Sequence, residues 1–478
     1  MRSVNLITLL FCSQLLHAQV LIKNAHVVDV EKKKILSGYT VLVSGDKIIS
    51  VDKDKVFKLP GSTQVIDAAG KYLVPGFTDA HIHFFQSGGL HARPDAIDLR
   101  KYRPYTEEIQ WVHNHMEDFL RRYLSVGITT VIDVGATNNF LRQRDSFTTK
   151  NYAPLIRITG PLLTTYVPEV YKNLKEDSPF EAMLTEEGTR KSVQEQLKLN
   201  PDFIKIWYIV TDKDVEKGAR KNLALVKAAI DEAHKNNKRV AVHATERITA
   251  QLAVEAGADF LVHSVDDEIV PDDFVKLLKE KKTVLCPTLV VAGNYGKVLG
   301  DTYDFTTDEL KITHPELAGT IIDYPLPDTA LAGMYINFLK NPAQHQKQRQ
   351  TDSVMAVNLK KLIDGGVIIA TGTDAGNTGT QHAASYFEEL KAMQAAGLNT
   401  WQLLEASTIN GAKAMGQEKE WGSIAQDKLA NMLLLSANPL DSLSNWRKVE
   451  WVMNRGSIFH PDSLITISPV DLVQQQLN

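Results

Sequence analysis

Cysteine is scarce in this sequence of 478 residues. The two cysteines are Cys12 and Cys286, and Cys12 belongs to an N-terminal segment that we expect to be removed. A chain that keeps only Cys286 cannot form an internal disulfide. Cys286 stands in the apolar run 283–287 with no histidine close to it in the sequence, which predicts a small core residue and not a nucleophile.

An excess of charge of either sign is also missing. The chain carries 53 Lys and Arg against 57 Asp and Glu, a net charge of −4, and its basic residues are scattered. This distribution argues against a nucleic-acid surface and against an acidic tail. Beyond the N-terminus no apolar run is long enough to cross a bilayer, so we expect no membrane contact after that segment is removed.

The N-terminus has the pattern of a signal peptide. Met1 and Arg2 form a short basic start, residues 4–16 are mostly apolar, and Ala18 precedes Gln19. This pattern predicts a signal peptide over residues 1–18 and export to the periplasm or out of the cell. A buried first strand and a membrane anchor are the alternatives, but the apolar run is too short to span a bilayer.

The chain divides into three parts by its hydrophobic pattern. Residues 19–75 and 417–478 read as short strands and turns, one of them at 422–425, whereas residues 76–416 alternate strands with helices. Eight strands are predicted in the middle part, at 76–83, 129–134, 155–159, 203–207, 239–243, 260–263, 284–287 and 367–373.

This alternation predicts an α/β fold, a (β/α)₈ TIM barrel over residues 76–416. The two outer parts would form one small β-sandwich domain built from both chain ends. A doubly wound sheet is the alternative. The connections 85–126 and 292–355 are too long for plain loops, so we expect them to carry helices and to cover the site, the second as a lid.

Two histidines close the first predicted barrel strand. His81 and His83 are two residues apart, so their side chains project from the same face of a strand. Two neutral imidazoles on one rigid strand are a preformed pair of metal ligands. A single His-x-His pair arises often by chance, so its meaning depends on further ligands.

Further ligand-type residues follow later strands. Lys205 interrupts the apolar run 203–207, His243 and His263 end the next two strands, and Asp374 follows the last strand. Active sites of barrels form at this carboxyl end of the strands. Taken singly, each residue is as well explained by packing, solvent contact or helix capping.

Lys205 has a specific chemical interpretation. A buried neutral amine can add CO₂ to form a carbamate, an anionic oxygen ligand able to bridge two metals. An unmodified ammonium facing two dications would be strongly unfavourable. The alternative is a lysine at the strand end whose ammonium reaches solvent.

The order of these motifs resembles the amidohydrolase superfamily, in its imidazolonepropionase-like branch, which includes metal-dependent dipeptidases. The matching segments are 75–83, 202–206, 240–244, 261–264, 372–376 and 422–435. The resemblance implies that His81 and His83 bind one metal, that His243 and His263 bind a second, and that carboxylated Lys205 bridges them. It also implies that Asp374 binds a metal and takes the proton of the bridging water.

By this resemblance a metal-bridging hydroxide attacks a carbonyl, and Asp374 hands its proton to the leaving amine. Zinc is the default metal for a site rich in histidine and oxygen ligands, with manganese and iron as alternatives. The expected activity is cleavage of C–N amide or peptide bonds in a small molecule such as a dipeptide or cyclic amide. A homo-oligomer is left open.

Two other functions stay open. His243 and Glu246 have the spacing by which one-metal deaminases of the superfamily carry a catalytic glutamate, so an aminated ring is an alternative substrate; Glu246 could equally cap the following helix. A non-catalytic barrel that only binds its ligand is the third hypothesis. Substrate contacts are expected from Tyr208, Arg247 and His382, which follow strand ends, and from Glu246.

Overall fold

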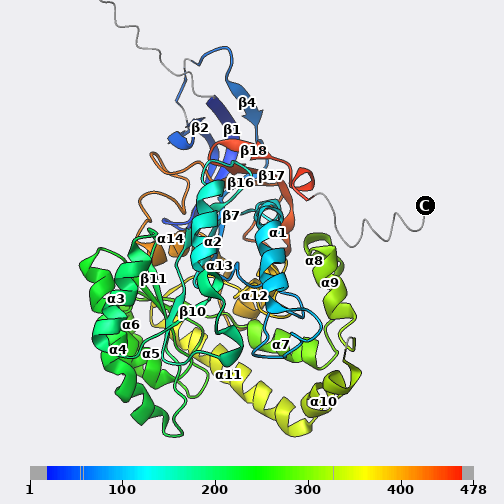
Figure 1. Ribbon diagram of the computed structural model, residues 1–478. Coiled ribbons are helices and arrows are strands. Elements are labelled where there is room, and N and C mark those ends of the chain that lie inside the picture. Colours follow the sequence, from blue (N-terminus) through cyan, green and yellow to red (C-terminus); the bar gives the residue numbers. More distant parts are fainter. Residues whose placement is uncertain (1–18, 54, 58, 327, 466–478) are drawn as a thin grey trace, which may run out of the picture.

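Strands from both ends of the chain pair in one sheet. The structure is a computed structural model that describes residues 19–53, 55–57, 59–326 and 328–465, so the predicted signal peptide and Cys12 lie outside the described residues. The sheet has eight strands in the order β18-β17-β16-β5-β1-β2-β3, with β4 beside β1 (Figure 1). Its strands are β1 (Gln19–Asp29), β2 (Lys34–Ser44), β3 (Lys47–Asp52), β4 (Gln64–Asp67), β5 (Tyr72–Pro75), β16 (Met432–Leu435), β17 (Val449–Asn454) and β18 (Ser457–Phe459).

The sequence explains most of this sheet, with one exception. Gly45 takes a φ of +60° in the tight turn between β2 and β3, a conformation that glycine adopts without strain. The prediction of a strand at 422–425 is wrong, because the described residues there form bends and no strand. Gly422 has a φ of +92°, outside the β region, and Ser423 donates to Glu31 instead of joining a ladder.

The middle of the chain forms two parallel sheets. One has the order β6-β7-β8 and the other β10-β9-β11-β12-β13-β14-β15. Strands occur at all eight predicted positions, as β6 (Phe77–Ile82), β7 (Ile128–Asp133), β8 (Leu155–Ile158), β11 (Ile204–Trp207), β12 (Val240–His243), β13 (Phe260–Val262), β14 (Val284–Cys286) and β15 (Ile368–Ile369). The short strands β9 (Leu162–Thr164) and β10 (Phe180–Ala182) escaped prediction because three residues show no clear period.

Backbone hydrogen bonds connect the two parallel sheets at two places. The Ala80 amide of β6 donates to the Thr371 carbonyl, just after β15, over 2.8 Å. At the second place the Asp202 amide, just before β11, donates to the Ile158 carbonyl of β8 over 2.9 Å; β8 is an edge strand of its sheet, whereas β11 lies beside β9 and β12 inside the other. The α/β class with parallel sheets agrees with the prediction.

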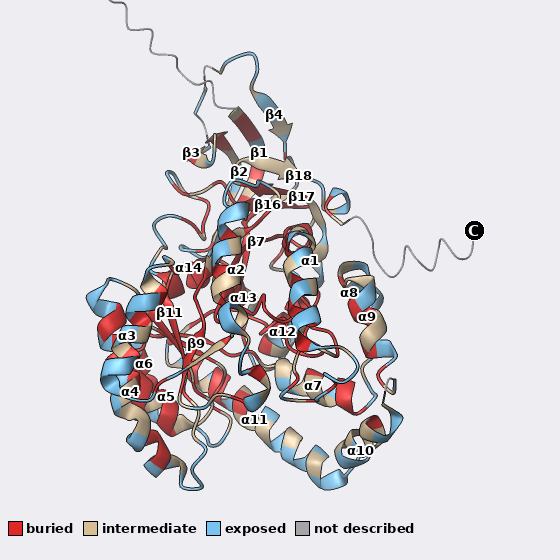
Figure 2. Ribbon diagram, viewed as in Figure 1, coloured by how far each residue is buried: buried red, intermediate tan, exposed pale blue. Residues whose placement is uncertain are grey.

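Helices cover the parallel strands and bury their apolar faces against them. The covering helices are α1 (Tyr105–Ser125), α2 (Asn138–Gln143), α3 (Glu186–Leu197), α4 (Val215–Lys235), α5 (Arg247–Ala256), α6 (Asp272–Lys281), α12 (Tyr386–Ala395), α13 (Thr400–Ala406) and α14 (Ile409–Met415). In α4 the apolar residues Val226, Ala229, Ile230 and Ala233 recur at helical spacing and are buried. Figure 2 shows the buried strands in the centre and the exposed outer faces of the helices.

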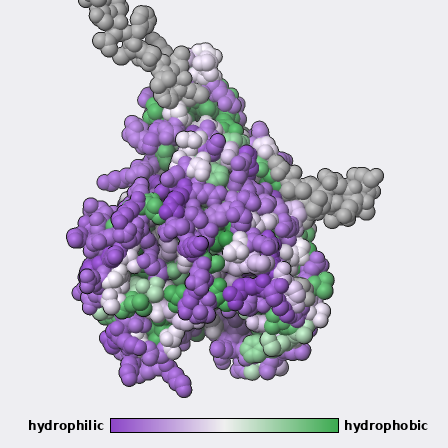
Figure 3. Space-filling model, in the orientation of Figure 1, coloured by the Kyte–Doolittle hydropathy of each residue, from purple (hydrophilic) through white to green (hydrophobic). Residues whose placement is uncertain are grey.

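The long connection 292–355 carries helices, as predicted. They are α7 (Val291–Leu299), α8 (Thr307–Ile312), α9 (Pro315–Ile322), α10 (Thr329–Leu339) and the first part of α11 (Pro342–Asp364). Most of the surface in view is hydrophilic, and apolar side chains gather over α9 and α10, where Ile322, Met334 and Phe338 are exposed (Figure 3). Within the described ranges, each helix is too short or too polar to cross a membrane.

Candidate metal centre

The two histidines of β6 meet the carboxylate of Asp374. His81 Nε2 lies 3.2 Å from His83 Nε2 and 3.1 Å from Asp374 Oδ1, and His83 Nε2 is 3.2 Å from the same oxygen. His81 is fully buried and His83 nearly so. Three potential ligand atoms therefore meet at one point, from two segments almost 300 residues apart in the chain.

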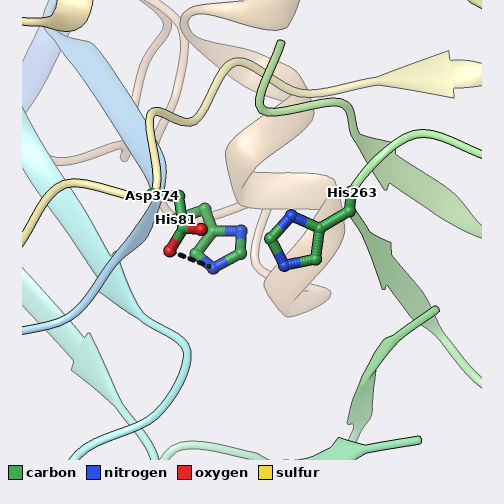
Figure 4. A group of neighbouring side chains, drawn as sticks. All are labelled: His81, His263 and Asp374. Carbon is green, nitrogen blue, oxygen red and sulfur yellow. Dashed lines mark ion pairs between the residues drawn. The ribbon is translucent and has the colours of Figure 1, made fainter. Parts of the chain in front are cut away.

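The histidines of β12 and of the end of β13 complete this group. The ring centroids of His81 and His263 are 4.8 Å apart, and those of His243 and His263 are 4.3 Å apart. His81, His263 and Asp374 offer ligand atoms that lie within 4.8 Å of one another, and their side chains point toward a common centre (Figure 4). Such a histidine and carboxylate cluster is compatible with a divalent metal ion.

Backbone strain accompanies two of these residues. His263 has a φ of +77° and Asp374 a φ of +61°, values that side-chain-bearing residues seldom adopt. Conformations of this kind persist where the surroundings over-determine them, as they do at functional sites. Here the Asp374 amide donates to the His81 carbonyl over 2.7 Å, and the His263 amide to the Cys286 carbonyl over 2.8 Å. Both side chains are thereby directed to the same centre.

Lys205 lies in this centre and not at the protein surface. Its side chain, on β11, is 1% exposed, and burial lowers the pKa of its amine from 10.5 to about 7. The described residues offer the Nζ atom no direct salt bridge, although Asp374 and Asp133 act on it electrostatically. A substantial fraction of this amine is therefore neutral near pH 7.

The predicted ligands share one cavity of about 110 Å³. His83, Lys205, His243, His263 and Asp374 line it, and His81 lies directly behind His83 and Asp374. The rest of the wall comes from the strands β9, β10 and β11 and from the connections that follow β6 and β15: Phe85, Gln86, Arg93, Leu162, Phe180, Trp207 and Asn377.

The donor set suits a cation. Burial lowers the pKa of His81 to about 4 and holds those of His243 and His263 well below 6.5, so these imidazoles are neutral at pH 7. Although burial alone would raise it, the pKa of Asp374 is held well below its ordinary value by His81 and His83. The buried His81 Nδ1 has no hydrogen-bond partner among the described residues. Neutral imidazoles beside an ionised carboxylate are ready to bind a metal.

Outer hydrogen bonds orient two of the rings. His83 Nδ1 is 2.8 Å from the Gly135 carbonyl oxygen, and His263 Nδ1 is 2.7 Å from Thr288 Oγ1. Because Nδ1 is engaged in each ring, Nε2 is the atom left for a ligand role. Asp79 supports the site from below by accepting from the Thr373 amide and hydroxyl. Burial raises the pKa of Asp79 to about 7.

Arg93 is a functional candidate that the sequence analysis missed. It lies in the long connection after β6, where the sequence has no regular period that would place it. Its guanidinium lines the cavity, donates through Nε and Nη2 to Asp95 over 2.8 and 2.7 Å, and donates through Nη1 to Asn377. Tyr295 from α7 donates to the same Asn377 oxygen over 2.6 Å. Arg93 is thus a fixed cation on the wall of the cavity.

Tyr208 and Arg247, two of the expected substrate contacts, lie outside the cavity wall. Tyr208 is fully buried and its hydroxyl donates to the Ala219 carbonyl over 2.5 Å, which ties β11 to α4. Arg247 donates to Glu268 over 2.6 Å and to Gln251 over 2.5 Å. Both side chains are engaged in protein contacts near the strand ends instead of facing the predicted metal ligands.

Glu246 and His382 are likewise engaged elsewhere. Glu246 precedes α5 and accepts from the Thr249 hydroxyl over 2.8 Å, without a capping bond to a backbone amide. His382 is buried; its Nδ1 is 2.9 Å from the Tyr123 hydroxyl and its Nε2 is 2.9 Å from the Gln86 carbonyl. The structure therefore does not bring these two residues to the cavity, because a strand end alone does not determine where a side chain points.

Known proteins resemble this chain over very different lengths. An imidazolonepropionase from Shouchella clausii is 24% identical over 466 residues, 90% of this chain and 87% of that protein. An adenine deaminase from Rubrobacter xylanophilus is 39% identical, but over 72 residues only, which are 15% of this chain and 12% of the deaminase. The crystal structure of a prolidase complexed with N-methylphosphonate-L-proline has a TM-score of 0.70 at 20% identity, covering 93% of this chain and 100% of that one.

An α/β fold whose parallel strands carry histidines, a lysine and a carboxylate to one cavity defines a class of metal-binding hydrolases. Residues 72–458 match the Amidohydrolase family, and the chain belongs to that family. The family resemblance drawn from the motifs is thereby confirmed, and the long match to an imidazolonepropionase supports the branch.

Proposed function

We propose that this protein is an exported, metal-dependent amidohydrolase that cleaves the C–N amide or peptide bond of a small substrate, a dipeptide or a cyclic amide. One observation carries the proposal: five predicted ligands line one small cavity, with the sixth, His81, directly behind it. The likeness to a prolidase fold and the family match are consistent with this activity. Export rests on the signal-peptide pattern of residues 1–18.

Two divalent metal ions would be held by the six ligands. His81 and His83 would bind one, His243 and His263 the other, and Asp374 would complete the set. Zinc suits these donors. Lys205 would bridge the metals as a carbamate: its amine nitrogen forms a bond to CO₂ and releases one proton. The buried amine with a pKa of about 7 supports this modification. The bound cations would supply an acidified water and polarise the substrate carbonyl.

Asp374 is the proton carrier in this proposal. Its ionised carboxylate lies at the centre of the ligand group and faces the cavity. It can accept a proton from the attacking water and pass that proton to the amine that leaves. An aspartate at the protein surface would transfer the proton less specifically, because bulk water would compete for it.

The position of Arg93 supports a substrate that carries a carboxylate. Two of its N–H groups donate to Asp95 and one to Asn377, which leaves one N–H on each terminal nitrogen without a partner among the described residues. Terminal guanidinium nitrogens bind carboxylates strongly because both partners are charged. Phe85, Phe180 and Trp207 would pack against the remainder of the substrate. A dipeptide has this combination of amide, carboxylate and apolar side chain.

We also propose that the two parallel sheets close into a (β/α)₈ barrel over residues 76–416, with the chain ends forming the small β-domain. The hydrogen bonds Ala80–Thr371 and Asp202–Ile158, which join the two parallel sheets at two places, support closure. Helices of residues 291–364 would act as the lid, since Tyr295 of α7 reaches Asn377 at the cavity wall. The substrate is a small molecule, not a nucleic acid.

A one-metal deaminase is the second candidate. The short matches to adenine deaminases favour it. Against it, Glu246, the residue that would carry the acid function, accepts from Thr249 and does not line the cavity.

Metal content and product analysis together test the proposal. Purified, metal-replete protein would be incubated with a dipeptide library, and the products would be identified by mass, while metals per chain are counted by elemental analysis. Two metals per chain with release of free amino acids is the expected result. One metal per chain with release of ammonia from an aminated ring would establish the deaminase instead, and metal-loaded protein inert on amides, esters and aminated rings would favour a binding protein.

A further inference from the structure

The turn between β14 and α7 contains a strained threonine. Thr288 is buried and has a φ of +47°, a conformation that is an outlier for a β-branched residue. Its hydroxyl lies 2.7 Å from His263 Nδ1. Strain of this kind is retained where the side chain has a defined task.

The hydrogen bond determines which nitrogen His263 presents. With Nδ1 occupied by Thr288, only Nε2 is available to a cation, and rotation of the ring is restricted. His83 is oriented in the same way, but by the backbone carbonyl of Gly135. Thr288 is therefore a side chain through which the orientation of one metal ligand can be altered by substitution.

Glu389 holds this turn in place. It is fully buried on α12, and its two carboxylate oxygens accept from the amides of Leu289 and Val290 over 3.0 and 3.1 Å. Val290 is the N-cap residue that precedes α7, and it provides no side-chain cap of its own. A buried carboxylate is costly unless it is hydrogen-bonded, and here its bonds secure the two residues after Thr288.

We propose that Glu389 and Thr288 are positioning residues for the metal site: Glu389 secures the backbone of residues 289–290, this keeps Thr288 in its strained conformation, and Thr288 orients His263. The inference rests on the metal site of the proposed function. Neither residue lines the cavity, so substitutions of these two residues should change metal affinity directly and catalysis only through it.

Two substitutions at Thr288 separate orientation from packing. T288V keeps the β-branch and the backbone strain but deletes the hydroxyl, whereas T288S keeps the hydroxyl. We expect T288V to weaken zinc binding at one of two sites about 10–100-fold, and T288S to stay within a few-fold of wild type. Zinc affinity would be measured by competition with a chromogenic chelator, and the thermal midpoint of the metal-free proteins would be compared. The proposal is overturned if T288V binds zinc as tightly as wild type. It is also overturned if the loss of zinc affinity is explained by a lower thermal midpoint of the metal-free T288V protein.

A double-mutant cycle tests the route from Glu389. E389Q preserves the shape of the side chain but places an amide NH₂ where one backbone amide needs an acceptor. We expect E389Q to weaken zinc binding in the wild-type background and to have little further effect in the T288V background. Equal effects in both backgrounds would show that Glu389 does not act through Thr288.

These measurements need no substrate. Wild-type protein that binds two zinc ions but hydrolyses no amide would refute the proposed activity and leave this inference standing. Wild-type protein that binds no metal would overturn both.

Discussion

At the scale of single residues, Lys205 is the most informative ligand. Among the residues that the structure describes it is the one lysine that lines the cavity, and its buried amine with a pKa of about 7 is what a carbamate requires. We expect K205A to lose metal and most activity, because the bridge between the two metals disappears. Metal per chain and turnover would be measured with and without added short carboxylates, which should restore part of both. Unchanged activity of K205A would contradict the proposed role of Lys205 as a bridge between the metals.

A substitution of Asp374 can distinguish a role in substrate binding from a role in catalysis. D374N keeps the shape of the side chain but cannot carry a proton between water and the leaving amine. We expect kcat to fall about 10²–10⁴-fold while KM changes little. Steady-state kinetics on the metal-loaded variant would check this, with its metal content measured in parallel. A raised KM at normal kcat would contradict the assignment.

Arg93 can be tested against a matched neighbour. Arg100 makes the same two-nitrogen contact to Asp98, but it is exposed and does not line the cavity. We expect R93K to raise KM about 10–100-fold for a substrate with a free carboxylate, since a charged hydrogen bond contributes about 1.5–3 kcal/mol. The carboxamide form of that substrate should show little change, and R100K should behave as wild type. Equal losses on both substrates would exclude carboxylate binding.

At the scale of elements, Gly372 lies where β14 and β6 pack closely against the segment after β15. A Cβ atom added there would lie 2.5 Å from Cys286 Sγ and 2.6 Å from the His81 amide nitrogen. We expect G372A to lower the free energy of unfolding by about 1–3 kcal/mol through overpacking, and to weaken metal binding by displacing His81.

The control for G372A is G319A in α9, where the added Cβ meets no atom within 4 Å. That change should be neutral or stabilise by up to about 1 kcal/mol, because alanine favours a helix. Urea unfolding of the metal-free proteins would provide the comparison. Equal stability of G372A and wild type would show that the strands can separate without cost.

At the scale of the whole molecule, stability should depend on pH partly through His382. Burial lowers the pKa of this ring to about 4 in the folded protein, whereas it is near 6.5 in the unfolded chain. Between these values the unfolded chain binds a proton that the folded protein does not, so stability rises as pH increases from about 4 to 6.5, by up to about 3 kcal/mol. H382Q should lack this part of the pH dependence.

Urea unfolding of metal-free wild type and H382Q at pH 4.5 and pH 7 would measure the effect. Other buried histidines titrate in the same range, so the quantity to compare is the difference between the two proteins at each pH. An equal change with pH in both would show that His382 does not carry this dependence.

The sequence by itself determined the parts of this protein that follow from local rules. Alternation of apolar strands and amphipathic helices located eight of the ten described strands of the parallel sheets, because side-chain period reflects backbone geometry directly. The ligand types were recognisable for a related reason: His81, His83, Lys205, His243, His263 and Asp374 lie within a predicted strand or directly after one, and parallel strands bring those ends to one edge.

Only the tertiary structure decided which side chains face the cavity. Arg93 reaches it from a long connection without a regular period, because Asp95 and Asn377 hold its guanidinium there. Tyr208 and His382 follow strand ends as the metal ligands do, yet partners from α4 and α1 hold them away from it. A side chain's direction depends on neighbours that are distant in sequence, and no local pattern contains that information.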